Sequence, residues 1–296
     1  MRNKCALCDT FSLKYLFTFN KFKIYQCLIC KAARVLPWPD KKVLEKYYDE
    51  FKYETGFITE KLIRKEARQF LKGISQSKGD LLDIGCGAGF YLDEAKKVGW
   101  KVTGVEMSKQ LADYATRKFN MPVIVGDFVK VKLPAKKFDV IVLSQVIEHL
   151  TDPKPMFNKI RLYLKNNGLF YIATPNIESW LFKVQRQNFP YMIPPEHVYF
   201  YSPQSITLLL KQNGFIVKSL STFGYQQDFA VIIKTVIKSK SSSMQNTNPI
   251  KNREYPKESV KLFKYILFDK IFCGILHPTL NINKRGSIIK LIAKKA

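Results

Sequence analysis

The stretch Leu81-Leu-Asp-Ile-Gly-Cys-Gly-Ala-Gly89 decides the fold of this chain. Its first four residues are mostly apolar and predict a short buried strand, and the run 90–98 that follows predicts a helix. Glycines between a strand and a helix let the backbone turn sharply and approach a ligand without a Cβ in the way. Because ligands of open α/β sheets bind at the carboxyl ends of strands, this loop predicts a binding site.

Apolar runs and helical patterns alternate along most of the chain. Strands are expected at 81–84, 101–105, 122–125, 138–143, 169–173, 215–220 and 287–293, and helices near 41–52, 59–73, 90–98, 108–118, 154–164 and 203–213. Strands separated by helices of this length predict a parallel, doubly wound, Rossmann-like α/β sheet.

Polar residues at the ends of these strands favour an adenosyl ligand. The loop has the spacing Gly-x-Gly-x-Gly after Asp83, which differs from the Gly-x-Gly-x-x-Gly of pyrophosphate binding and favours a cofactor without a diphosphate. Glu106 ends the second strand, where a carboxylate can accept hydrogen bonds from both ribose hydroxyl groups. Asp127 ends the third strand and can accept from the adenine amine while Phe128 flanks the ring, and Ser144 ends the fourth.

Five segments carry a resemblance to a known family. They are LLDIGCGAGFYLDEAKKVGWKVTGVEMS (81–108), GDF (126–128), FDVIVLSQVIEHLTDP (138–153), NNGLFYIATPN (166–176) and PPEHVYFYSPQSITLLLKQNGF (194–215). From about 80 to 223 the chain resembles a class I S-adenosylmethionine (SAM) methyltransferase of the 3-demethylubiquinone O-methyltransferase-like group. The resemblance implies a seven-stranded sheet whose last strand is antiparallel. It also implies a SAM site formed by Asp83, Gly85, Cys86, Gly87, Glu106, Met107, Asp127, Phe128, Ser144 and Gln145.

Four of the six cysteines form two pairs, Cys5-x-x-Cys8 and Cys27-x-x-Cys30, with 18 residues between the pairs. This spacing predicts a zinc-ribbon-like site, in which a hairpin brings four thiolates together around a structural zinc ion. Two disulfides or redox cysteines are the alternatives. Disulfides are disfavoured because no secretory signal is recognisable at the start of the chain, and redox chemistry is disfavoured because it would need only one pair. Members of the resembling group can carry such a front end.

The acceptor of the methyl group is poorly defined by the sequence. The resemblance places His197 in a loop over the acceptor pocket, where the ring either acts as a general base or only pins the proline-rich loop. The aromatic segment 176–193 could grip a sugar, a quinone ring or a lipid. Glu148 and His149 are expected to shape the pocket floor, and Gln145 stands where related chains have an acid, which disfavours a catalytic metal.

The basic composition bears on whether the methyl acceptor is RNA or a small molecule. The formal net charge of +25 favours a polyanion such as RNA, and an RNA methyltransferase that binds through the zinc module is the alternative function. Against it, only 9 of the 49 basic residues are arginine and the lysines are spread along the chain. We therefore expect a small-molecule acceptor, with nucleic acid a weaker candidate.

The chain is expected to divide into five parts. These are a zinc-ribbon-like module (1–38), a helical lead-in (39–78), a methyltransferase core (79–224), a helical or flexible insertion (225–285) and the final strand (286–296). The apolar, lysine-dotted run 257–276 predicts a helix that lies on a membrane surface, on the sheet or in a dimer, and the sequence leaves the oligomeric state open. The expected location is cytoplasmic or peripheral to the membrane.

Overall fold

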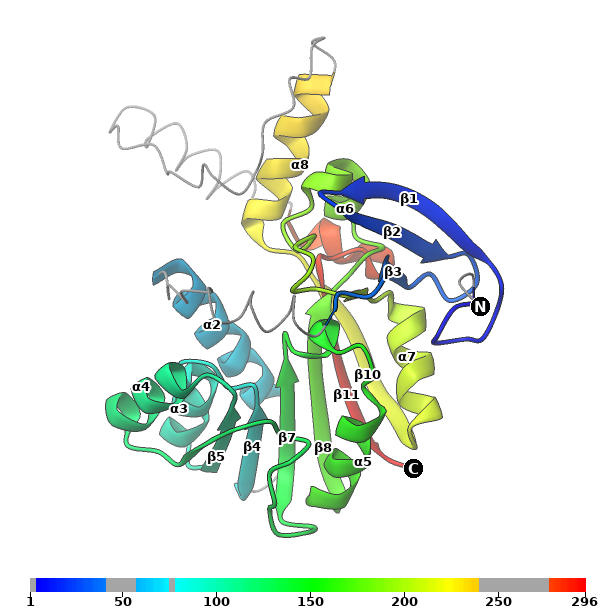
Figure 1. Ribbon diagram of the computed structural model, residues 1–296. Coiled ribbons are helices and arrows are strands. Elements are labelled where there is room, and N and C mark those ends of the chain that lie inside the picture. Colours follow the sequence, from blue (N-terminus) through cyan, green and yellow to red (C-terminus); the bar gives the residue numbers. More distant parts are fainter. Residues whose placement is uncertain (1–3, 41–56, 75–77, 240–276) are drawn as a thin grey trace, which may run out of the picture. The chain divides into compact units, whose positions relative to one another are not determined.

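The structure is a computed structural model that describes residues 4–40, 57–74, 78–239 and 277–296 (Figure 1). The described residues group into two compact units, and each unit is discontinuous in sequence. Unit 1 takes them from Met1–Pro39, Pro175–Leu208 and Leu220–Lys290, and unit 2 takes them from Asp40–Thr174, Leu209–Ser219 and Leu291–Ala296. The division of the chain predicted from the sequence stays a prediction.

A seven-stranded sheet of order β10-β11-β8-β7-β4-β5-β6 contains most of the predicted strands. The strands are β4 (Asp80–Ile84), β5 (Lys101–Glu106), β6 (Val123–Val125), β7 (Phe138–Ser144), β8 (Leu164–Pro175), β10 (Phe215–Phe223) and β11 (Ile288–Lys295). Five of them, β8-β7-β4-β5-β6, pair in parallel. The α/β fold with a doubly wound sheet is confirmed.

The last strand runs against its neighbours. Ala296 at the end of β11 donates its backbone N–H to the carbonyl of Gly214, which precedes β10, at 3.0 Å. At the other end, Ser287 before β11 lies beside Phe223, the last residue of β10, with 3.4 Å between its Oγ and the Phe223 carbonyl oxygen. The start of β11 lies beside the end of β10 and the end of β11 lies beside the start of β10, so β11 is antiparallel to β10, as expected.

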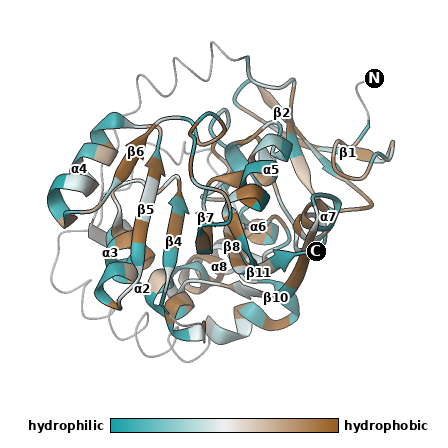
Figure 2. Ribbon diagram, turned by 90° about the horizontal axis from the view of Figure 1, so that it is seen from below, coloured by the Kyte–Doolittle hydropathy of each residue, from teal (hydrophilic) through white to brown (hydrophobic). Residues whose placement is uncertain are grey.

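Helices cover both faces of this sheet (Figure 1, Figure 2). The helices beside the sheet are α2 (Phe57–Gly73), α3 (Phe90–Lys97), α4 (Lys109–Phe119), α5 (Lys154–Tyr163) and α7 (Pro203–Gln212). Helices α2 and α3 lie on one face and α5 lies on the other, where Phe157 packs against the rings of Phe170 and Phe215. Hydrophobic colour is concentrated on central strands such as β7 and β8, as burial on both faces requires (Figure 2).

Unit 1 contains a second sheet, which the sequence did not predict in full. Its order is β1-β2-β3-β9, with β1 (Leu13–Phe19), β2 (Phe22–Cys27), β3 (Ala33–Leu36) and β9 (Tyr199–Phe200). The hairpin of β1 and β2 turns at Asn20, whose φ of +51° is the left-handed conformation that asparagine tolerates. The pairing of β3 with β9 joins the N-terminal module to the segment after β8.

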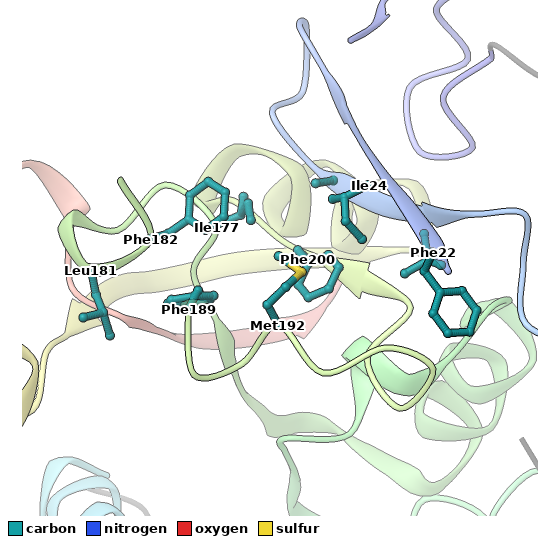
Figure 3. Close-up of a cluster of buried hydrophobic side chains, with 10 residues drawn as sticks. Phe22, Ile24, Ile177, Leu181, Phe182, Phe189, Met192 and Phe200 are labelled. Carbon is teal, nitrogen blue, oxygen red and sulfur yellow. The ribbon is translucent and has the colours of Figure 1, made fainter. Parts of the chain in front are cut away.

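A hydrophobic cluster lies under this second sheet (Figure 3). Side chains of β2 and β3 pack there against side chains from residues 177–200, namely Phe22, Ile24, Ala33, Val35, Ile177, Leu181, Phe182, Phe189, Met192 and Phe200. The helical elements α6 (Trp180–Gln185), η1 (Ile147–His149), η2 (Arg186–Asn188), α8 (Gln226–Ser239) and η4 (His277–Lys284) complete the description. The aromatic segment therefore shares one core with the N-terminal hairpin.

Two expected helices concern residues that the structure does not describe. The helix near 41–52 and the helix at 257–276 both fall outside the described residues. Within the described ranges, no helix combines the length and hydropathy that crossing a bilayer requires.

Candidate functional site

The loop after β4 contains two positions whose backbone conformation and close neighbours require glycine. Gly85 and Gly89 have φ of +69° and +78°. A Cβ at Gly85 would come within 2.6 Å of Val146 Cγ2, and one at Gly89 within 2.7 Å of Ala115 Cβ. Any side chain at these two positions would therefore strain or displace the loop.

Glu106, at the end of β5, ties this loop to the start of the next helix. Its Oε2 accepts from the Gly87 backbone N–H at 2.8 Å, and its Oε1 accepts from the Ser108 N–H at 2.8 Å. Each carboxylate oxygen has a second acceptor position, so the ribose hydroxyl groups expected at Glu106 still have acceptors. Met107, the next residue, is 73% exposed.

Strand register places three of the predicted site residues on one face of the sheet. Asp83 pairs with Gly104 on one side and with Val142 on the other. Directly paired residues share a face and so do residues two apart along a strand. Asp83, Glu106 and Ser144 therefore point to the same face at the carboxyl ends of β4, β5 and β7.

Electrostatics at this edge favour a positively charged ligand. Burial raises the pKa of the Asp83 carboxyl well above its ordinary value, and the nearby charges of Glu106 and Glu66 raise it further. Burial likewise raises the pKa of the Cys86 thiol, and the charges of Asp83 and Glu106 add to that effect. A cation bound here would relieve the repulsion between these carboxylates.

The remaining predicted cofactor residues lie at the ends of β6 and β7. Asp127 accepts from the Val129 N–H through Oδ1 at 2.9 Å. Phe128 is buried, and its ring meets Tyr163 edge-on at 5.9 Å between centroids. Gln145 has a φ of +56°, an uncommon conformation for a residue other than glycine that often marks a functional turn.

Sequence reasoning missed Glu66 of α2. Its Oε1 accepts hydrogen bonds from Ser144 Oγ and from the Tyr171 hydroxyl, both at 3.1 Å. Glu66 is buried, and it interrupts the apolar helical stripe that includes Leu62, Ile63, Ala67, Phe70 and Leu71. A charged residue inside a core-facing stripe was the signal that could have identified it.

His197 belongs to unit 1 and is 4% exposed. Its Nδ1 lies 2.8 Å from the carbonyl oxygen of Tyr191. A carbonyl can only accept, so Nδ1 carries the proton and the neutral ring has its basic lone pair on Nε2. This contact pins the loop around the cis Pro194-Pro195 bond and orients the ring at the same time.

Glu148 is buried in unit 2, and its Oε2 accepts from Thr174 Oγ1 at 3.0 Å. The residue belongs to the short 3-10 helix η1 that follows β7. This hydrogen bond ties η1 to β8 inside unit 2, so the carboxylate has a structural partner there.

The four N-terminal cysteines converge. Their sulfur atoms all lie within 4.8 Å of one another, with 3.6 Å between Cys5 and Cys30 and 3.5 Å between Cys8 and Cys27. A tetrahedral zinc with Zn–S bonds of about 2.3 Å places its sulfurs roughly 3.8 Å apart. The thiols are unbridged, and the hydrogen bond from Cys30 lowers the pKa of Cys5 to about 5. The donor set therefore fits zinc.

Comparison with known proteins decides the family. The model of a methyltransferase domain family matches residues 56–220, which is more than half of the chain. The chain belongs to this methyltransferase family. The predicted enzyme class, a SAM-dependent methyltransferase, is thereby confirmed.

The curated proteins that resemble this chain share about a quarter of their aligned residues with it. The ubiquinone biosynthesis O-methyltransferase of Coxiella burnetii is 25% identical over 156 residues, which cover 49% of this chain and 67% of that protein. The enzyme of the same name from Histophilus somni is 26% identical over 174 residues, covering 53% of this chain and 72% of its own length.

Solved structures support the fold. A SAM-dependent methyltransferase from Thermotoga maritima aligns with a TM-score of 0.54 at 19% identity, covering 86% of this chain and 99% of that one. A second one, from Archaeoglobus fulgidus, aligns with a TM-score of 0.51 at 19% identity, covering 86% of this chain and all of its own.

Proposed function

We propose that this methyltransferase transfers the methyl group of SAM to a hydroxyl oxygen of a small molecule, such as a sugar, a quinone-like ring or a lipid-linked compound. The curated relatives are O-methyltransferases, which favours oxygen as the acceptor atom. The observation that carries the proposal is the orientation of His197, whose Nδ1 is committed to the Tyr191 carbonyl. A ring fixed in this way has its base at Nε2.

SAM, when bound, supplies a methyl group on a positively charged sulfur. In the proposed reaction His197 Nε2 would take the proton that the acceptor hydroxyl loses when its oxygen receives the methyl group. SAM would leave as a neutral thioether, and the imidazole ring would carry the proton and its positive charge. Such an in-line transfer depends mainly on positioning, to which a general base adds about 10²–10⁴ in rate.

For the cofactor we propose the site at the carboxyl ends of the unit 2 strands. Asp83 and the loop residues Gly85, Cys86 and Gly87 would hold the methionine half, and Glu106 and Met107 the ribose and adenine. Asp127 and Phe128 would border the adenine, and Ser144 and Gln145 would close the floor. The donor set supports this assignment, because buried carboxylates favour a ligand with an ammonium and a sulfonium group.

For the four cysteines we propose a structural zinc ion. Four protein ligands leave no open position for chemistry. Support comes from the sulfur separations and from the hydrogen bond of 2.8 Å from Ser202 Oγ to the Cys30 carbonyl, which links the knuckle to the segment after His197.

RNA is the second candidate acceptor, and the net charge of +25 is the observation that favours it. Methyl transfer from labelled SAM into fractionated cell extract separates the two. We expect label in the small-molecule or lipid-extractable fraction, and label in RNA alone would overturn the small-molecule proposal.

The base is tested by His197→Ala in the same assay. We expect the rate of label transfer to fall about a hundredfold while SAM affinity stays unchanged, because the ring acts on the acceptor. A wild-type rate in this variant would leave His197 with a role in holding the loop alone.

A further inference from the structure

Helix α2 brings a buried carboxylate to the proposed cofactor site. Arg64, half a turn before Glu66, donates through Nη1 to Glu94 of α3 at 2.7 Å and also pairs with Asp93. These ion pairs fix α2 against α3. Glu66 is left only 8% exposed on the side of α2 that packs on the sheet, where Phe70, one turn later, meets the Tyr171 ring at 4.2 Å between centroids.

Two hydroxyl groups aim at one oxygen of Glu66. Ser144 Oγ and the Tyr171 hydroxyl each donate to Oε1 at 3.1 Å. Tyr171 pairs with Val142, and Val142 pairs with Asp83, so all three strands present this row to the face that α2 covers. These two hydrogen bonds hold the carboxyl group of Glu66 directly beside the predicted site residue Ser144.

Three carboxylates thus come together from three separate elements. Glu66 belongs to α2, Asp83 to β4 and Glu106 to β5. Like charges gathered away from water are costly unless a cation joins them. The methionine half of SAM carries an ammonium, a sulfonium and one carboxylate and is positive in sum, whereas its adenosine half is neutral.

We propose that Glu66 is a further residue of the SAM site, where its carboxylate faces the positive charges of the methionine half and positions the Ser144 hydroxyl. This inference rests on the cofactor site proposed above. It adds a residue from outside the strand-loop motifs and gives it a specific task, recognition of charge.

The test compares two ligands by titration calorimetry, SAM and methylthioadenosine, which keeps the adenosine half on a neutral thioether. Glu66→Gln removes the charge and keeps the size. We expect it to weaken SAM about tenfold and methylthioadenosine less than about twofold, because a lost charge-assisted interaction has this magnitude. Glu66→Asp keeps the charge and should recover part of the affinity for SAM.

Glu60→Gln is the matched control, because it makes the same change in the same helix at a residue that pairs with Arg64. We expect both ligands to bind it as they bind the wild type. Equal losses for both ligands in Glu66→Gln, or no loss for SAM, would overturn the proposal. Failure of the wild-type chain to bind SAM would instead remove the proposed cofactor site, and this inference with it.

Discussion

Glu106 shows how one residue can shape the loop and still serve a ligand. Both of its oxygens accept backbone N–H groups, from Gly87 and from Ser108, so the carboxylate fixes the loop before any ligand arrives. Preorganisation of this kind lowers the cost of binding. Asp83 stands beside it without such backbone help and is raised in pKa by burial and by its neighbours.

The raised pKa of Asp83 predicts proton release on SAM binding. The charged groups that act on it are Glu106 from β5 and Glu66 from α2, and these two carboxylates disfavour a third negative charge. A bound cation favours the ionised form, so the pKa of Asp83 falls on binding and a proton leaves. SAM affinity should therefore increase as pH rises toward the raised pKa of the free protein and level off above it.

Titration calorimetry in two buffers with different ionisation enthalpies counts these protons. Asp83→Asn, which cannot titrate, should abolish the release and flatten the pH dependence. Uptake of protons by the wild type would contradict the assignment of Asp83 as the group that meets the cation.

At this scale the sequence predicted the strand-end residues because strand ends converge in a parallel sheet. Ser144 and Glu66, by contrast, are 78 positions apart, and only packing of α2 on the sheet brings them together. Phe128 was expected beside an adenine, but its ring packs on Tyr163, a contact that no local pattern contains. The role of its ring stays a prediction.

Among the elements, the N-terminal hairpin and β9 have the closest bearing on function. Ala33 pairs with Phe200 and Arg34 pairs with Tyr199, and the Val35 N–H donates to the Val198 carbonyl at 3.0 Å. The strand that receives these bonds begins two residues after His197. A zinc ion that fixes the knuckle would therefore also stabilise the backbone next to the proposed base.

Loss of the zinc ligands should loosen this sheet and leave SAM binding in place. We expect about one zinc per chain in the purified protein by elemental analysis and a substoichiometric amount in Cys27→Ser, because a tetrahedral site needs all four thiolates. Hydrogen exchange in β1, β2, β3 and β9 should then increase. Cys86→Ser is the matched control and should retain the metal, and full zinc in Cys27→Ser would refute the site.

Elements with strong local patterns were predicted well, and elements defined by distant partners were not. Strands β4, β5 and β7 follow mostly apolar runs between helical patterns, and their observed bounds lie within one residue of expectation. Strand β9 is two residues long, and its partner β3 lies more than 150 positions away in the sequence. Such pairings carry no periodic signal.

For the whole molecule, the two units assign separate tasks to separate parts of the chain. Unit 2 holds every predicted cofactor residue, and unit 1 holds His197 and the four cysteines. Both units are built from several separate stretches of the chain. The positive charge is spread over lysines along the whole chain, as on a solvated surface.

Hydrogen exchange with and without SAM, followed by mass spectrometry, tests the proposed cofactor site. We expect slower exchange on SAM addition in peptides covering 81–89, 105–108, 126–128 and 144–145, where the proposed contacts lie. SAM binding with no protection in these segments, or protection centred on the cysteine module, would contradict it.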